Sequence, residues 1–85
     1  MTDMERKTFC AALRRYGAQA QITMAFEEMA ELQKELCKSL RGKDNRGYIA
    51  EEIADVRIML DQMVILHDCA EDVDTWRKGK LWRLE

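Results

Sequence analysis

Two pairs of carboxylate residues, each pair spaced by three positions, are the residues of this chain best suited to chemistry. Glu28 and Glu31 form the first pair, and Glu52 and Asp55 form the second. A spacing of three places both members of a pair on one face of a helix, ~5–6 Å apart at their Cβ atoms. Four carboxylates in one place repel one another unless cations neutralise them, and such oxygen ligands suit Mg²⁺. The two pairs therefore predict a magnesium site, provided that their helices pack antiparallel.

The acidic residues allow two other interpretations. An acidic pair on a helix is common, and its plainest interpretation is a solvated face; an idealised wheel even places Glu31 well away from the apolar stripe. The doubling of the pattern favours a site. A di-iron helical bundle also uses carboxylates from facing helices, but it needs a histidine three residues after a glutamate on two of them. Neither Glu28 nor Glu52 has one, so that interpretation is weak.

The elements that must position these residues are helices. The chain has no proline, only four glycines and many strong helix formers, which predicts an all-α fold. Apolar spacings of three and four predict a first helix ending near Gly17 and a second ending at 41–42. A loop follows at 42–47, with Asp44 or Asn45 as the N-cap of a third helix. A break at 67–68 then leads to a short fourth helix.

The predicted core consists of one apolar stripe on each helix. The stripes comprise Phe9, Ala12, Leu13, Tyr16 and Ala20; Ile22, Ala25, Phe26, Met29, Leu32, Leu36 and Leu40; Ile49, Ile53, Val56, Leu60 and Met63; and Val73, Trp76, Leu81 and Leu84. The third helix also carries a second row, Ala54, Ile58 and Ile65, about 150° from the first. This second row predicts a homodimer or homotetramer, the alternative being that the first or last helix covers it.

Length and composition exclude several classes of protein. Eighty-five residues form a single domain, 1–85, and 47% hydrophobic against 35% charged residues argues against disorder. A net charge of −2 argues against a nucleic-acid partner bound through a basic face, and no apolar run approaches the ~18 residues that a membrane span needs. Three widely spaced cysteines predict reduced thiols. With no apparent signal peptide, we expect a soluble, cytoplasmic protein.

The acidic pattern and its flanks resemble a known family. EMAE at 28–31, twenty intervening residues and EIAD at 52–55 look like the E-x-x-E … E-x-x-D signature of the MazG-like all-α nucleoside triphosphate pyrophosphatases. The longer segments FEEMAEL at 26–32 and EEIADV at 51–56 agree with it. WRKGKLWRL at 76–84 resembles the basic last helix of short, phage-type members. The resemblance covers roughly residues 16–84 and implies a four-helix MazG-like bundle that forms oligomers.

This resemblance implies Mg²⁺-dependent hydrolysis of a nucleoside triphosphate to the monophosphate and pyrophosphate. Glu28, Glu31, Glu52 and Asp55 would ligate the ion, for which Mn²⁺ is a possible substitute. Each of two further acids, Glu27 and Glu51, precedes a ligand by one residue and would accept the proton of the attacking water, although a plain surface role explains them equally well.

Four more residues are candidates for substrate contacts. Lys34, Lys80 and Arg83 are bases suited to phosphate oxygens, and Gln21 lies on the helix edge of Glu28, from which it would reach a base or sugar. Pairing with Glu31 is a simpler explanation for Lys34. The competing hypothesis for the whole chain is a non-enzymatic helical oligomerisation or regulatory module whose acidic residues are solvated.

Overall fold

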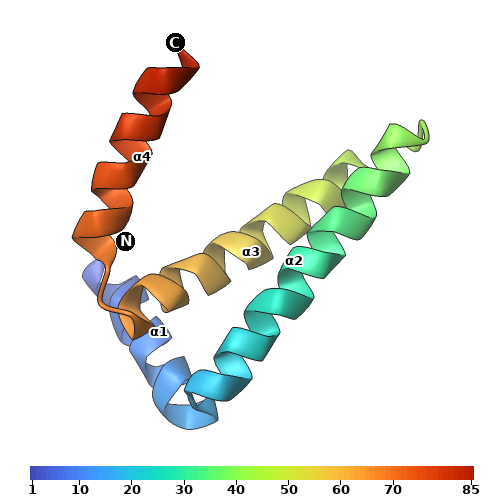
Figure 1. Ribbon diagram of the computed structural model, residues 1–85. Coiled ribbons are helices and arrows are strands. Elements are labelled where there is room, and N and C mark those ends of the chain that lie inside the picture. Colours follow the sequence, from blue (N-terminus) through green and yellow to red (C-terminus); the bar gives the residue numbers. More distant parts are fainter.

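The computed structural model describes all 85 residues and contains four α-helices and no strands. They are α1 (Asp3–Tyr16), α2 (Ala18–Leu40), α3 (Arg46–Leu66) and α4 (Ala70–Leu84). The predicted all-α class, the number of helices and the breaks between them are confirmed. In Figure 1, α2 and α3 lie side by side, α1 crosses near the end of this pair, and α4 stands apart. None of the helices combines the length and apolar character that a membrane crossing requires.

Gly17 separates α1 from α2. Its φ of 88° lies in the left-handed region, where a residue with a side chain would be strained, and its N–H donates to the carbonyl of Leu13 to end α1. At the other end of α1, Thr2 accepts from the backbone N–H of Glu5, whose carboxylate accepts from the N–H of Thr2. This capping box fixes the start of the helix, so α1 has well-defined ends.

The turn between α2 and α3 is closed by the side chain of Asn45. Asn45 is the N-cap residue of α3, in agreement with the sequence, but its side chain makes no capping hydrogen bond. Its Nδ2 instead donates to the Glu35 carbonyl oxygen at 2.9 Å and to Glu35 Oε1 at 3.0 Å. Lys38 Nζ lies 3.0 Å from the other carboxylate oxygen. The start of α3 is thus tied to the last turns of α2, which sets the antiparallel pairing of the two helices.

The tie through Glu35 predicts a pH dependence of stability. Hydrogen bonds from Asn45, followed by that from Lys38, hold the pKa of the Glu35 carboxyl below its ordinary value of 4.5. A carboxyl whose pKa is lower in the folded state stabilises the protein above the unfolded pKa, and this contribution is lost as the pH falls through the folded pKa. In urea titrations, we expect the stability difference between wild type and Glu35→Gln to be largest near neutral pH and to shrink below pH 4.5. A pH-independent difference would contradict this.

The core is small and unusually polar. Seven residues are buried: the apolar Phe9, Ala25 and Met59, and the polar Gln21, Glu35, Asn45 and Gln62. The prediction that these apolar stripes form the core of a single chain is therefore largely wrong. Residues predicted inward but exposed include Tyr16, Phe26, Met29, Leu36, Leu40, Ile53 and Leu60. The physical reason is that α2 and α3 pack along a line through Ala25 and Met59 and that α1 crosses only near one end of the pair, so much of the apolar surface beyond this line has no neighbour.

α4 makes the largest departure from the predicted packing. None of its residues is buried, and it packs only against α3. The predicted inward positions Val73, Trp76, Leu81 and Leu84 are all exposed. Figure 1 shows the helix leading away from the α2–α3 pair to the C-terminus. The side chains of α4 stay exposed because the helix contacts only α3 and does not pack against α1 or α2.

Candidate metal centre

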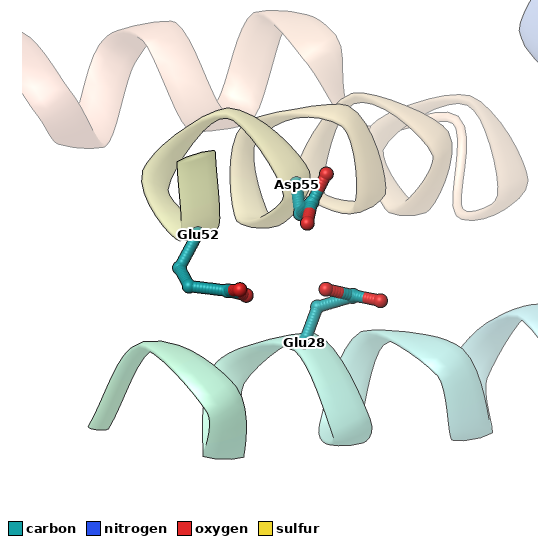
Figure 2. A group of neighbouring side chains, drawn as sticks. All are labelled: Glu28, Glu52 and Asp55. Atoms are coloured by element: carbon teal, nitrogen blue, oxygen red, sulfur yellow. The ribbon is translucent and has the colours of Figure 1, made fainter. Parts of the chain in front are cut away.

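Three of the four predicted ligands meet between α2 and α3. Glu28 comes from α2, and Glu52 and Asp55 come from α3; one carboxylate oxygen of each lies within 4.8 Å of the others. Figure 2 shows the three side chains entering the space between the two helices from opposite sides. We call these three residues the carboxylate cluster. The antiparallel α2–α3 pairing produces it, because residues early in α3 lie opposite the middle of α2.

The environment of the carboxylate cluster disfavours its negative charge. Partial burial raises the pKa of the Glu28 carboxyl, and the neighbouring charges of Asp55 and Glu52 raise it further. Burial likewise raises the pKa of the Glu52 carboxyl, with additional contributions from Asp55 and Glu31. Neither ion pair of the chain, Lys38–Glu35 or Lys78–Asp74, includes a member of the cluster. A cation would therefore remove a repulsion that no side chain of this molecule offsets.

One oxygen of the cluster lacks any hydrogen-bond partner. Glu52 Oε2 is inaccessible to solvent and accepts no hydrogen bond. A buried carboxylate oxygen without a partner is costly, and native proteins rarely leave one unless an ion, a water molecule or a catalytic role accounts for it. This orphaned oxygen, directed into a group of carboxylates, fits a hard divalent cation that takes oxygen ligands.

Glu31, the fourth predicted ligand, stands beside the cluster rather than in it. Its side chain is exposed on α2, which agrees with its position on the helical wheel. Its charge nevertheless contributes to the raised pKa values of Glu28 and Glu52, so it lies close to both. Mg²⁺ takes six ligands in octahedral geometry and usually keeps several waters among them. The role of Glu31 as a ligand stays a prediction.

The remaining charged candidates are all exposed. Glu27 and Glu51 lie next to the cluster along the chain and face solvent, which is compatible with a proton acceptor at its edge. Lys34 is exposed on α2 and forms no ion pair with Glu31, so the simpler explanation for it is not supported. Lys80 and Arg83 lie on α4, which does not pack against α2. Within a single chain these two bases are therefore held apart from the helix that carries Glu28.

Gln21 occupies a different environment from the one expected. It is buried, and its Nε2 donates to Oε1 of Gln62 at 2.7 Å, across the α2–α3 interface. The sequence predicts Gln21 on a helix edge open to a substrate, whereas the structure buries it, and the hydrogen bond to Gln62 gives it a structural role. Gln62, its partner, was missed by the sequence analysis; its only signal was a glutamine three residues after Met59, on the same helix face. The substrate contact predicted for Gln21 stays a prediction.

A cavity lies where the end of α1 meets the N-terminal half of α2. Its volume is about 440 Å³, and it is lined by Tyr16, Ala20, Gln21 and Met24. Met24 precedes Glu28 by four residues, which corresponds to one helical turn, or ~6 Å along the axis. One lining residue of this cavity, Met24, therefore lies about one helical turn from Glu28 along α2.

Comparisons with known proteins give no further identification: no family model, no curated protein and no solved structure matches the chain.

Proposed function

We propose that this protein is a Mg²⁺-dependent hydrolase that converts a nucleoside triphosphate into its monophosphate and pyrophosphate. The observation that supports it most is the buried, unpartnered oxygen of Glu52 inside a cluster of three carboxylates. Most acidic surface clusters are solvated and hydrogen-bonded to water, whereas in this half-buried cluster one oxygen, Glu52 Oε2, has neither solvent contact nor a partner. The acidic motifs that resemble the MazG-like pyrophosphatases supply the reaction class.

Glu28, Glu52 and Asp55 would hold the ion, with Glu31 at their edge. When bound, Mg²⁺ offsets charge on phosphate oxygens and lowers the pKa of a coordinated water. The protein residues hold the ion and accept a proton. The cluster would bind the triphosphate only through the cation that it holds, because carboxylates alone repel phosphate. Glu27 or Glu51, exposed beside it, accepts the proton of the attacking water. Attack at the α-phosphorus forms a P–O bond from the water and breaks the bridging P–O bond to the β-phosphate, which releases pyrophosphate.

The cavity beside Met24 supports a nucleoside substrate. Tyr16 offers an aromatic ring and Ala20 and Met24 offer apolar surface, which together suit the flat face of a base. A second cavity shares these three residues and adds polar side chains from Gln19, Thr23 and Glu27. A substrate whose triphosphate lies at Glu28 would thus have its nucleoside directed toward the N-terminal end of α2.

The reaction products test this function. With a panel of nucleoside triphosphates and Mg²⁺ in ¹⁸O-water, we expect phosphorus NMR to show labelled monophosphate and unlabelled pyrophosphate. Label in pyrophosphate would place the attack at the β-phosphorus, and release of orthophosphate would place it at the γ-phosphorus. No turnover with any member of the panel would contradict the proposal.

A second candidate, a non-enzymatic oligomerisation module, is favoured by the exposed apolar side chains of α2 and α3. Thermal melting distinguishes the two. Because an ion that binds only the native state shifts the folding equilibrium, millimolar Mg²⁺ is expected to raise the Tm of the proposed enzyme by several degrees and EDTA to reverse it. In the module the carboxylates are merely solvated, and Mg²⁺ should leave the Tm unchanged.

A further inference from the structure

α4 leaves both tryptophans of the chain in solvent. The chain has two tryptophans, Trp76 and Trp82, and both lie on α4. They are 63% and 77% exposed, although tryptophan is highly buried on average. α4 packs only against α3, and Figure 1 shows it standing apart from the other helices. Two large aromatic rings on such a helix are available to a ligand with flat or apolar faces.

The same half of α4 concentrates positive charge. Residues 76–84 contain four of the fourteen basic residues of the chain and none of its sixteen acidic ones. This segment therefore carries +4, and the rest of the chain, with ten bases and sixteen acids, carries −6. Lys78 Nζ lies 3.1 Å from Asp74 Oδ2. The three bases without an ion pair are Arg77, Lys80 and Arg83. The net charge of −2 thus conceals a basic segment that attracts an anionic partner.

Gly79 lies midway between the two tryptophans. It is three residues from each, so Trp76 and Trp82 lie about 60° round the helix from it on opposite sides, and ~4.5 Å along the axis in opposite directions. Glycine destabilises a helix interior relative to alanine. Neither backbone nor packing requires it here, because its φ is not positive and a Cβ would meet no atom within 4 Å. The helix backbone is therefore open to a ligand between two aromatic rings. We call Trp76, Gly79 and Trp82 the tryptophan notch.

A single-stranded nucleic acid has the chemistry that fits this surface. Its unpaired bases stack on exposed aromatic rings, and its phosphates bind basic side chains. Lys80 Nζ lies 6.0 Å from the centre of the Trp76 ring, so a cation is close to a ring on which a base would stack. In a duplex the bases are already paired and stacked on one another, and they offer no free face to the two rings.

The distribution of apolar residues on α4 argues against a lipid surface as the partner. A helix that lies in a membrane interface gathers its apolar residues on one face. Trp76 and Trp82 are instead about 120° apart round α4. Arg77 lies between Leu84 and Leu81, at about 20° and 40° from them. The apolar residues of α4 therefore do not form one uncharged face.

We propose that the C-terminal half of α4, residues 76–84, binds single-stranded nucleic acid. Bases stack on Trp76 and Trp82 across Gly79, and the phosphates bind the three bases without an ion pair. The proposal uses none of the carboxylates and needs no metal ion, so its failure would leave the proposed hydrolysis untouched. It also gives Lys80 and Arg83 a ligand on their own helix, which does not pack against α2.

The tryptophans provide the measurement, because their intrinsic fluorescence reports on α4 alone. In EDTA and at low salt, we expect an oligothymidine of about ten nucleotides to quench this fluorescence saturably. Three neutralised phosphates give a logarithmic salt slope near −2 for single strands. Raising NaCl from about 50 to about 200 mM should therefore weaken binding about twentyfold. Trp82→Leu should weaken it roughly tenfold, because one stacked base is lost.

Two helical glycines provide a matched pair of variants. Gly79→Leu fills the tryptophan notch but keeps both rings and every charge, and it should weaken binding roughly tenfold. Leucine favours a helix and would find open space at this position, so the fold should be retained. Gly47→Leu on α3 also places its Cβ in open space and should bind like wild type.

Two exposed lysines control for charge in the same way. Lys80→Gln should weaken oligothymidine binding several-fold, whereas Lys7→Gln on α1 removes the same charge away from the tryptophan notch and should have little effect. Circular dichroism checks that all variants keep their helical content.

Several results would overturn the proposal. Unchanged fluorescence with oligothymidine is the first, and equal binding by Gly79→Leu and wild type is the second. Competition by deoxythymidine triphosphate at an equal nucleotide concentration would assign the rings to the substrate. A response to phosphatidylglycerol vesicles but not to oligothymidine would assign them to an anionic membrane. Wild-type emission that shifts to the red on dilution, without any ligand, would show that a second copy of the chain covers them.

Discussion

Glu52→Gln is expected to lower turnover by roughly a hundredfold or more while leaving the helical content unchanged. The amide keeps the shape of the side chain and one acceptor oxygen, but it removes the charge that holds the cation. Burial raises the pKa of the Glu52 carboxyl, so its ionised form destabilises the metal-free folded protein. The variant should therefore also lose most of the Tm increase that Mg²⁺ gives to wild type, and it should melt slightly higher than wild type in EDTA.

These two readouts separate a metal ligand from a structural residue. Steady-state assays and paired melts with Mg²⁺ and EDTA measure them, and Glu28→Gln and Asp55→Asn should behave alike because the three residues form one cluster. Glu71→Gln is the control: it makes the same chemical change at an exposed glutamate in the first turn of α4. Full activity in Glu52→Gln would remove the central residue of the proposed function. If Glu52→Gln loses activity but keeps the full Tm increase with Mg²⁺, Glu52 is not a ligand of the ion.

Asn45→Ala should have the largest effect on stability of any single polar substitution in the chain. The change removes both hydrogen bonds to Glu35 and leaves the carbonyl and one carboxylate oxygen of that residue without this donor. A buried acceptor that loses its partner is costly, and in a domain of this size the expected fall in Tm is on the order of 5–10 °C. The few buried residues elsewhere offer little to compensate.

Asp44→Ala provides the matched control for Asn45→Ala. Asp44 is the neighbouring residue, it is exposed, and the sequence made it an equal candidate for the cap of α3. If Asn45 acts through Glu35, differential scanning calorimetry should show a large fall in Tm for Asn45→Ala and a small one for Asp44→Ala. Equal falls would mean that the two residues act only at the start of α3, and that the tie to Glu35 contributes little.

The sequence was sufficient to predict the helices and the meeting of three of the four carboxylates, Glu28, Glu52 and Asp55. Helix boundaries follow from local chemistry: Gly17 adopts a positive φ, and the segment after Leu40 lacks the apolar spacing of a helix. The cluster follows from period and connection length, because a short turn makes α2 and α3 antiparallel and brings Glu28 opposite Glu52. The helix ends thus follow from local residues, and the cluster follows from the short turn that joins two neighbouring helices.

Burial and side-chain partners were decided by the tertiary structure. Apolar spacing shows that a helix has an apolar face, but it does not show which neighbour covers that face. Phe26 was accordingly predicted in the core and is exposed, whereas Gln21 was predicted to contact a substrate and is buried against Gln62. The hydrogen bonds of the turn between α2 and α3 also depend on the tertiary structure. The sequence predicts that Asn45 caps α3, but its side chain donates to Glu35 of α2 instead. These outcomes depend on the rotation of α2 against α3, which packing of the whole molecule sets and no local pattern encodes.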